Sequence, residues 1–297
     1  MLTEKQNPNT QHLDQMDTLS MLRLMNEEDQ KVALAVQNVL PQIAKAVDIA
    51  RDKFTIGGRL FYIGAGTSGR LGVLDAVECV PTFGVSHEKV QGIIAGGEGA
   101  FVQAVEGAED DTDAGRETLI ERELSADDVL VGVAASGRTP YVLGAVDYAK
   151  SIGTPTIGVA CNDPSPLLEA VDIPIGVVVG SEILTGSTRL KAGTAQKLVL
   201  NMISTAAFAQ LGKVYGNLMV DVQVTNEKLA QRAKHIIQEI ANVDATRAET
   251  LLHASGNNVK VAIVMAVCEL DYEEAVKRLS DAGGYLRKVM NGSGGDA

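Results

Sequence analysis

The chain has 297 residues, 45% of them hydrophobic, and a formal net charge of −12. Its length is sufficient for one large domain, or for one large and one small domain. The negative charge excludes a broad nucleic-acid-binding surface, which needs a basic stripe, but a small phosphorylated ligand needs only local donors.

The three cysteines are far apart and form no Cys-x-x-Cys pair, and the four histidines lack the spacing of metal ligands. Neither a disulfide framework nor a metal site is therefore expected. The first residues are polar and do not resemble a signal peptide, and no apolar run approaches the roughly 20 residues of a membrane span. These features predict a cytoplasmic protein.

The N-terminal region, residues 1–54, reads as a polar arm followed by helices. Residues 1 to about 15 are polar, so we expect this arm to be disordered or held by another subunit. Helical periodicity begins at Leu19, again near Glu28 and again at Pro41, and the last helix ends before Gly57 and Gly58.

The middle region, residues 55–218, alternates short apolar runs with helical patterns. Continuous apolar strands need a cover on both faces, which favours an α/β fold with a five-stranded parallel sheet between helices. The predicted strands are 59–63, 90–95, 128–134, 154–160 and 173–179, and the predicted helices between them are 69–79, 100–107, 112–123 and 140–152.

The chain after the last predicted strand, which includes the end of the middle region, reads as helical. A long helix is predicted over 187–211 with Gly212 as its stop, and a connecting helix lies within 219–242. Residues 243–297 form a small module and a flexible tail, and the module resembles a ubiquitin-associated-type bundle, although ubiquitin recognition need not follow from such a likeness. Its three predicted helices are 244–254, 258–268 and 271–281.

Two strand-to-helix turns share a pattern of hydroxyls, a glycine and an arginine. The first is Thr67-Ser68-Gly69-Arg70, and the second is Ser136-Gly137-Arg138-Thr139. Glycine lets backbone N–H groups approach an anion closely, and the following helix N-terminus favours negative charge. One such turn can be an ordinary βα connection, but two, with a third hydroxyl-rich turn at 185–189, predict a phosphate site at the carboxyl ends of the strands.

These tandem turns resemble a sugar-isomerase (SIS) domain, a flavodoxin-like phosphosugar-binding fold. Longer strings resemble the N-acetylmuramic acid 6-phosphate etherases more specifically, and the likeness runs from the N-terminal arm to the terminal module. The strings are YIGAGTSGRLGVLDAVEC at 62–79, IAGGE at 94–98, AVEGAED at 104–110, LTGSTRLKAGTAQK at 184–197 and GNLMVD at 216–221.

The resemblance implies a lyase that removes D-lactate from C3 of N-acetylmuramic acid 6-phosphate with water, giving N-acetylglucosamine 6-phosphate. It implies no metal and no organic cofactor. The family's two acid/base glutamates fall on Glu78 and Glu109, and the division of roles between them stays open. The candidate substrate-binding residues are Gly66, Thr67, Ser68, Glu98, Ser136, Gly137, Thr139, Ser187 and Lys191.

The chemistry requires one carboxylate and one carboxylic acid whose pKa values differ. Glu78 lies between Val77 and Cys79, and this apolar setting predicts a raised pKa. Glu109 lies in an acidic run that also reads as a solvated surface loop, and Glu98 can equally occupy a turn. Other cations near the motifs also read as solvated helix residues: Arg70, Arg138, Arg189 and Lys197.

The position of Glu78 suggests a shared site. If its helix starts near Gly69, Glu78 lies about 14 Å from the phosphate-binding turn, at 1.5 Å per residue. We therefore expect a homodimer in which Glu78 serves the partner subunit. Two rival interpretations are a non-enzymatic phosphosugar sensor, which needs no glutamates, and a sugar-phosphate isomerase, which has no ether to cleave.

Overall fold

The computed structural model describes residues 1–103 and 105–292, and these form two compact units. The first unit comprises Met1–Val77 and His87–Thr205, and the second comprises Glu78–Ser86 and Ala206–Ala297. Two helices, α3 (Gly66–Phe83) and α8 (Lys191–Phe208), run from the first unit into the second. The predicted connecting helix therefore lies in the same unit as the terminal module.

The first unit is built on the predicted five-stranded parallel sheet, in the order β2-β1-β3-β4-β5. This is the flavodoxin-like order, so the predicted fold class is confirmed. The edge strand β5 is shorter than predicted and contains Pro174, whose missing N–H is tolerated at an edge. The strands are β1 (Leu60–Gly64), β2 (Val90–Ile94), β3 (Val129–Val133), β4 (Thr156–Ala160) and β5 (Ile173–Gly176).

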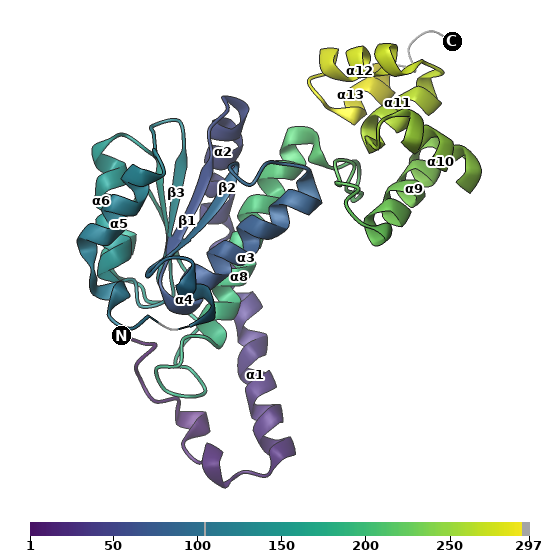
Figure 1. Ribbon diagram of the computed structural model, residues 1–297. Coiled ribbons are helices and arrows are strands. Elements are labelled where there is room, and N and C mark those ends of the chain that lie inside the picture. The colour runs from purple at the N-terminus through teal and green to yellow at the C-terminus, as the bar shows by residue number, and fades with distance from the viewer. Residues whose placement is uncertain (104, 293–297) are drawn as a thin grey trace. The chain divides into compact units, whose positions relative to one another are not determined.

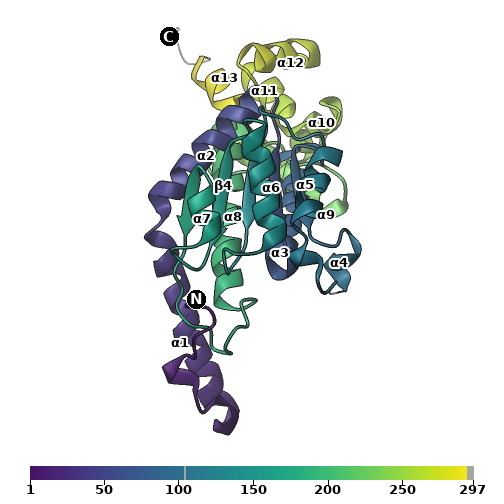
Figure 2. The same ribbon diagram turned by 90° about the vertical axis from the view of Figure 1, so that its left-hand side faces the viewer.

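Helices cover both faces of the sheet, as continuous apolar strands require. On one face Phe61, Ile63 and Leu130 pack against α5 (Thr112–Glu121), α6 (Pro140–Ser151) and α7 (Pro166–Ala170) (Figures 1 and 2). The other face carries α2 (Leu40–Thr55), α3 and α8 (Figure 1).

A buried carboxylate joins the helices of that second face. Asp75 on α3 is 5% exposed and accepts hydrogen bonds from Tyr62 on β1 and from Asn201 and Ser204 on α8. Three donors satisfy the charge that burial would otherwise penalise. The α3 helix is thereby held against the sheet and α8.

The N-terminal arm is ordered and bonds to its own chain, so the expectation of disorder is wrong; the alternative, an arm held by another subunit, stays a prediction. The Asn162 side chain, after β4, accepts hydrogen bonds from the N–H groups of Leu2 and Thr3 and donates to the Thr3 hydroxyl. The Thr10 hydroxyl donates to the carbonyl of Ile183 at 2.8 Å. Thr3 is fully buried, because this docking supplies partners that a polar segment would otherwise find in water.

Several predicted helices differ in extent from those observed. The two helices expected from Leu19 and Glu28 are one, α1 (Thr18–Gln37), which Asp17 caps at its start. The helix expected over 100–107 is reduced to α4 (Gly99–Val102), and residue 104 lies outside the described residues. The helix expected from 187 begins at Lys191, and a π-helical turn follows it, in which Gly212 has a φ of 75°.

The second unit has its own apolar core, formed mainly by α9, α10 and α11. The three predicted module helices are present, and α13 adds one that the sequence analysis did not anticipate. The last residues of the predicted tail, 293–297, lie outside the described residues. The helices are α9 (Glu227–Ala241), α10 (Ala245–Ala254), α11 (Val259–Cys268), α12 (Tyr272–Asp281) and α13 (Leu286–Gly292).

Within the described residues no single helix has the length and apolar composition of a membrane span; α10 and α11 meet that test together, by length and composition alone, with a bend of 115° between them.

Candidate functional site

The first predicted turn joins β1 to α3 at the carboxyl edge of the sheet. The α3 helix begins at Gly66, which has a φ of 53°, so the N–H groups of its first turn have no partner within the helix. Thr67 is half-buried, and Ser68 is 7% exposed and donates its hydroxyl to Gln196 Oε1 at 3.0 Å. The N–H of Gly69 donates to the carbonyl of Ala65 at 3.2 Å. The preceding N–H groups of this turn and the adjacent hydroxyls are the kind of donors that an anion requires.

The second predicted turn lies next to the first. Gly64 and Val133, the last residues of β1 and β3, are paired across the sheet, so the turns that follow them are neighbours. Gly137 has a φ of 68°, and a Cβ there would lie 2.2 Å from Ser165 Oγ, so only glycine fits. The hydroxyls of Ser136 and Thr139 belong to half-buried residues at the start of α6.

The third turn approaches the first through α8. A Cβ added to Gly193 would lie 3.3 Å from Thr67 Cγ2, so the beginning of α8 packs beside the first turn. Ser187 is half-buried in this turn. The carboxylate of Glu182 accepts the N–H groups of Lys191 and Ala192 at 3.0 and 2.9 Å and so caps α8. The structure thus brings together all three hydroxyl-bearing turns.

Lys191 points into the protein rather than toward the turns. It is 1% exposed, and its Nζ lies 2.7 Å from Glu28 Oε2 on α1. Burial alone would raise the pKa of the Glu28 carboxyl, but hydrogen bonds from Lys191, Lys31 and Asn9 outweigh burial and lower that pKa to about 2. The Lys191 ammonium therefore forms an ion pair with Glu28. Its role as a substrate ligand stays a prediction.

The three candidate glutamates are all exposed. Glu78 is on α3, twelve residues after Gly66 and hence about 18 Å further along the helix. Glu109 lies in a 3-10 turn, and Glu98 precedes α4. Within the described residues none of these carboxylates has a hydrogen-bond or ion-pair partner. Val77 is 61% exposed, so the apolar neighbours do not enclose Glu78 within one chain.

Arg70 has a structural role that the sequence analysis did not anticipate. Its guanidinium donates to the carbonyls of Phe101 and Ala100, at 2.9 and 2.7 Å. These bonds hold the loop that contains Glu98 beside the start of α3. The other three cations considered, Arg138, Arg189 and Lys197, are exposed.

Sequence reasoning also missed Gln196 and Asn162, the first bound to Ser68 and the second to the carbonyl of Ala135, next to Ser136. No local pattern distinguishes them, because Gln196 is next to Lys197 and Asn162 is next to Asp163, so each is one polar residue among others. Metal ligands are a separate matter: within residues 1–103 and 105–292 no group of three or more His, Cys, Asp or Glu side chains is arranged to hold an ion.

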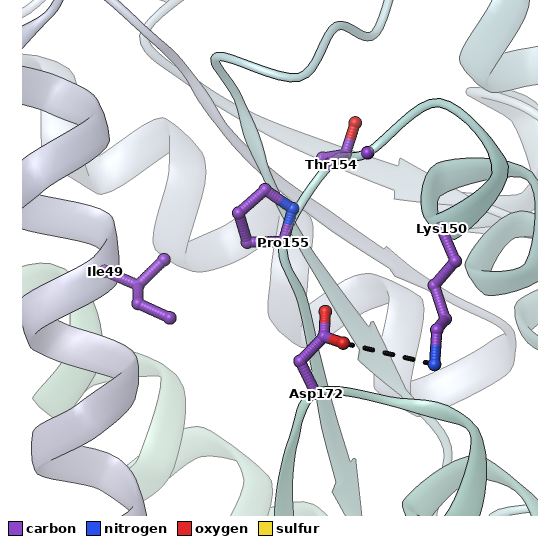
Figure 3. Close-up of a pocket in the computed structure, with 6 residues that line it drawn as sticks. Ile49, Lys150, Thr154, Pro155 and Asp172 are labelled. Atoms are coloured by element: carbon purple, nitrogen blue, oxygen red, sulfur yellow. Dashed lines mark ion pairs between the residues drawn. The ribbon is translucent and has the colours of Figure 1, made fainter.

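A pocket of about 350 Å³ lies at the opposite edge of the sheet, before β4 and β5 (Figure 3). Its polar groups already have partners: Lys150 donates to the carbonyl of Ala170, and Asp172 accepts from the N–H and hydroxyl of Thr156. This pocket does not include any of the candidate residues. The lining residues are Ile49, Lys150, Gly153, Thr154, Pro155 and Asp172.

Comparison with known proteins decides which family carries these turns. The chain is 52% identical to an N-acetylmuramic acid 6-phosphate etherase of Pasteurella multocida, over 98% of this chain and 96% of that protein. It is 54% identical to the etherase of Serratia proteamaculans, over 98% of each. The chain belongs to the N-acetylmuramic acid 6-phosphate etherase family. The resemblance seen in the sequence strings is thereby confirmed.

Two wider comparisons agree with the fold of this etherase family member. Residues 32–150 match the N-terminal SIS domain of glucokinase regulatory protein, and residues 216–259 match the C-terminal lid domain of that protein. A phosphoheptose isomerase from Francisella tularensis aligns with a TM-score of 0.51 at 18% identity, covering 65% of this chain and 100% of the isomerase. At that identity the likeness concerns the fold alone.

Proposed function

We propose that the chain cleaves the D-lactyl ether of N-acetylmuramic acid 6-phosphate with water, giving N-acetylglucosamine 6-phosphate and D-lactate. The observation that carries this proposal is identity of 52–54% to etherases along 98% of the chain. The enzyme would serve amino-sugar and cell-wall sugar catabolism. We infer that the enzyme acts in the cytoplasm, because the phosphate group retains its substrate inside the cell.

The phosphate would bind where the first two turns adjoin. Backbone N–H groups at the start of α3 and α6 and the neighbouring hydroxyls provide donors for its oxygens. The second turn requires glycine at 137, because any side chain there would collide with Ser165. The residues proposed to contact the phosphosugar are Gly66, Thr67, Ser68, Glu98, Ser136, Gly137, Thr139 and Ser187.

The reaction needs proton transfers in both its stages, elimination and water addition, on the open-chain aldehyde. A carboxylate removes the C2 proton, which the neighbouring carbonyl acidifies, and the electron pair forms the C2–C3 double bond. The C3–O bond breaks as a carboxylic acid protonates the departing lactate oxygen. Water then adds its oxygen to C3 and returns a proton to C2. We assign these roles to Glu78 and Glu109, and the assignment of acid and base between the two is left to experiment.

The exposed surroundings of Glu78 support a shared site in a homodimer. Leu74, one helical turn before Glu78 on α3, is 48% exposed, and Val77 is 61% exposed. On α1, Leu19, Leu22 and Leu34 are also exposed. Exposed apolar side chains clustered on helices mark protein interaction surfaces. A partner covering α3 would enclose Glu78 in an apolar environment at the subunit interface.

The deciding experiment is to incubate the purified chain with N-acetylmuramic acid 6-phosphate and to measure released D-lactate. Glu78→Gln and Glu109→Gln should each lower kcat by at least about 100-fold, the usual contribution of a positioned acid or base. Glu106→Gln, an exposed neighbour, is the matched control and should retain activity. A folded wild-type chain that releases no lactate would refute the etherase proposal; aldose–ketose conversion would indicate an isomerase, and phosphosugar binding alone a sensor.

A further inference from the structure

The Gln196 side chain, on α8, lies directly behind the first turn. The residue is 1% exposed, and its Oε1 accepts the hydroxyl proton of Ser68 at 3.0 Å. Its Nε2 is buried and, among the described residues, has no hydrogen-bond partner. A buried amide N–H without a partner is rare in folded proteins and carries a desolvation penalty. Ser68 therefore satisfies the carbonyl half of this amide, and nothing among the described residues satisfies the N–H half.

The direction of the bond between Gln196 and Ser68 decides what Ser68 can offer to an anion. A serine hydroxyl has one proton, and a phosphate oxygen accepts protons but does not donate them. When that proton points to Gln196 Oε1, Ser68 presents only lone pairs to the phosphate, which repel it. Rotating the amide by half a turn fills the same volume, because its oxygen and nitrogen are nearly the same size. Nε2 then donates to Ser68 Oγ, and the serine proton is free.

We propose that Gln196 is a positioning residue for the phosphosugar, and that its amide N–H holds Ser68 Oγ so that the Ser68 hydroxyl donates to the substrate phosphate. The inference rests on the proposed function, since it takes the first turn as the phosphate site. Gln196 itself does not touch the substrate. It acts through Ser68, and the packing of α8 beside Thr67 keeps it in reach.

The second turn has a comparable feature. Ser165 Oγ is buried without a partner among the described residues, and it lies 2.2 Å from where a Cβ of Gly137 would be. Of the three buried side-chain atoms without a partner in the described part of the chain, two therefore adjoin the two phosphate turns. The side chains of Gln196 and Ser165 thus each have an unpaired polar atom behind a phosphate turn. This is expected of side chains that support the turns and whose orientation is fixed when an anion binds.

Two substitutions of similar size separate orientation from packing. Gln196→Glu keeps the shape and, when ionised, can only accept the Ser68 proton, so the carboxylate fixes the unfavourable direction. We expect KM for the phosphosugar, and the inhibition constant of inorganic phosphate, to rise about 10- to 100-fold, with kcat changing much less. Gln196→Met removes both polar atoms and frees the serine proton without orienting it, so its effect on both constants should be smaller.

A double-substitution cycle tests whether Gln196 acts through Ser68. In the Ser68→Ala background, Gln196→Glu should cause no further rise in either constant, because the hydroxyl that it misdirects is gone. A further rise would mean that the introduced charge repels phosphate directly and would overturn the inference, as would a larger effect from Gln196→Met than from Gln196→Glu. If Gln196→Glu fails to fold, as thermal unfolding will show, the same cycle with Gln196→Met decides: additive effects overturn the inference. In either case lactate release by the wild type tests the proposed function separately.

Discussion

The buried ion pair between Glu28 and Lys191 gives the sharpest stability prediction, and the perturbation is Glu28→Gln. The two residues are 3% and 1% exposed, and Nζ and Oε2 lie 2.7 Å apart. Glu28 also accepts from Lys31 on α1 and from Asn9 in the arm, at 2.5 and 3.2 Å. The Glu28 carboxylate thus joins α1, α8 and the arm. It accepts hydrogen bonds from one side chain of each: Lys31, Lys191 and Asn9.

The magnitude follows from the pKa. The Glu28 carboxyl has an ordinary pKa of 4.5 and a folded-state pKa of about 2, a difference of about 2.5. At about 1.36 kcal/mol per pKa unit, ionised Glu28 contributes about 3 kcal/mol to the free energy of unfolding. Since the folded-state pKa is the lower one, this contribution is fully present above pH 4.5 and is lost as the pH falls toward 2. At neutral pH, Glu28→Gln leaves Lys191 buried and unpaired, so a loss of about 3–5 kcal/mol is expected.

The assay is urea unfolding of the first unit, followed by hydrogen exchange of α1 amides, at pH 7 and at steps down to pH 3. Glu28→Gln should lower the free energy of unfolding at pH 7 and flatten its acid dependence. Lys191→Met combined with Glu28→Gln should recover part of the loss, because no buried charge remains. Lys31→Met is the matched control, since its side chain is 55% exposed and its removal should cost less than about 1 kcal/mol. A Glu28→Gln loss no larger than that of the control, with an unchanged acid slope, would refute this reasoning.

Three further predictions concern the dimer, the arm and a buried thiol. Mixing Glu78→Gln subunits with Glu109→Gln subunits, each with kcat lowered at least about 100-fold, should restore lactate release if Glu78 serves the partner subunit's site; no recovery in a dimer shown to exchange subunits would contradict sharing. Asn162→Ala removes the side-chain bonds to Leu2, Thr3 and Ala135 and should lower the free energy of unfolding of the first unit by about 1–3 kcal/mol. The substitution should accelerate hydrogen exchange more in the arm than in α6. Burial, with a smaller effect of Glu182, raises the pKa of the Cys161 thiol to about 12, so a thiol reagent at pH 8 should modify Cys161 only after unfolding, and reaction in the folded protein would show that the thiol is accessible.

The sequence alone determined the sheet and its turns, because the signals are local. A buried parallel strand such as Val129–Val133 is apolar throughout, and a turn such as Ser136-Gly137 needs glycine for its backbone conformation. Strand order and the adjacency of the two turns follow from the rules of parallel α/β folds. The boundaries were less accessible: α1 continues through Glu28, near which a second helix was expected to begin, and tertiary partners bury that side chain.

Only the tertiary structure decided which polar side chains face inward. Lys191 is a candidate substrate ligand in the sequence, yet a carboxylate 163 residues away makes its burial favourable. The polar arm reads as disordered, yet Asn162 supplies its partners from the far end of β4. Gln196 is likewise a polar side chain whose partner, Ser68, is distant in the sequence. A buried polar group is stable only when its partner is present, and partners distant in the chain leave no local pattern; apolar periodicity and turn chemistry are written within a few residues.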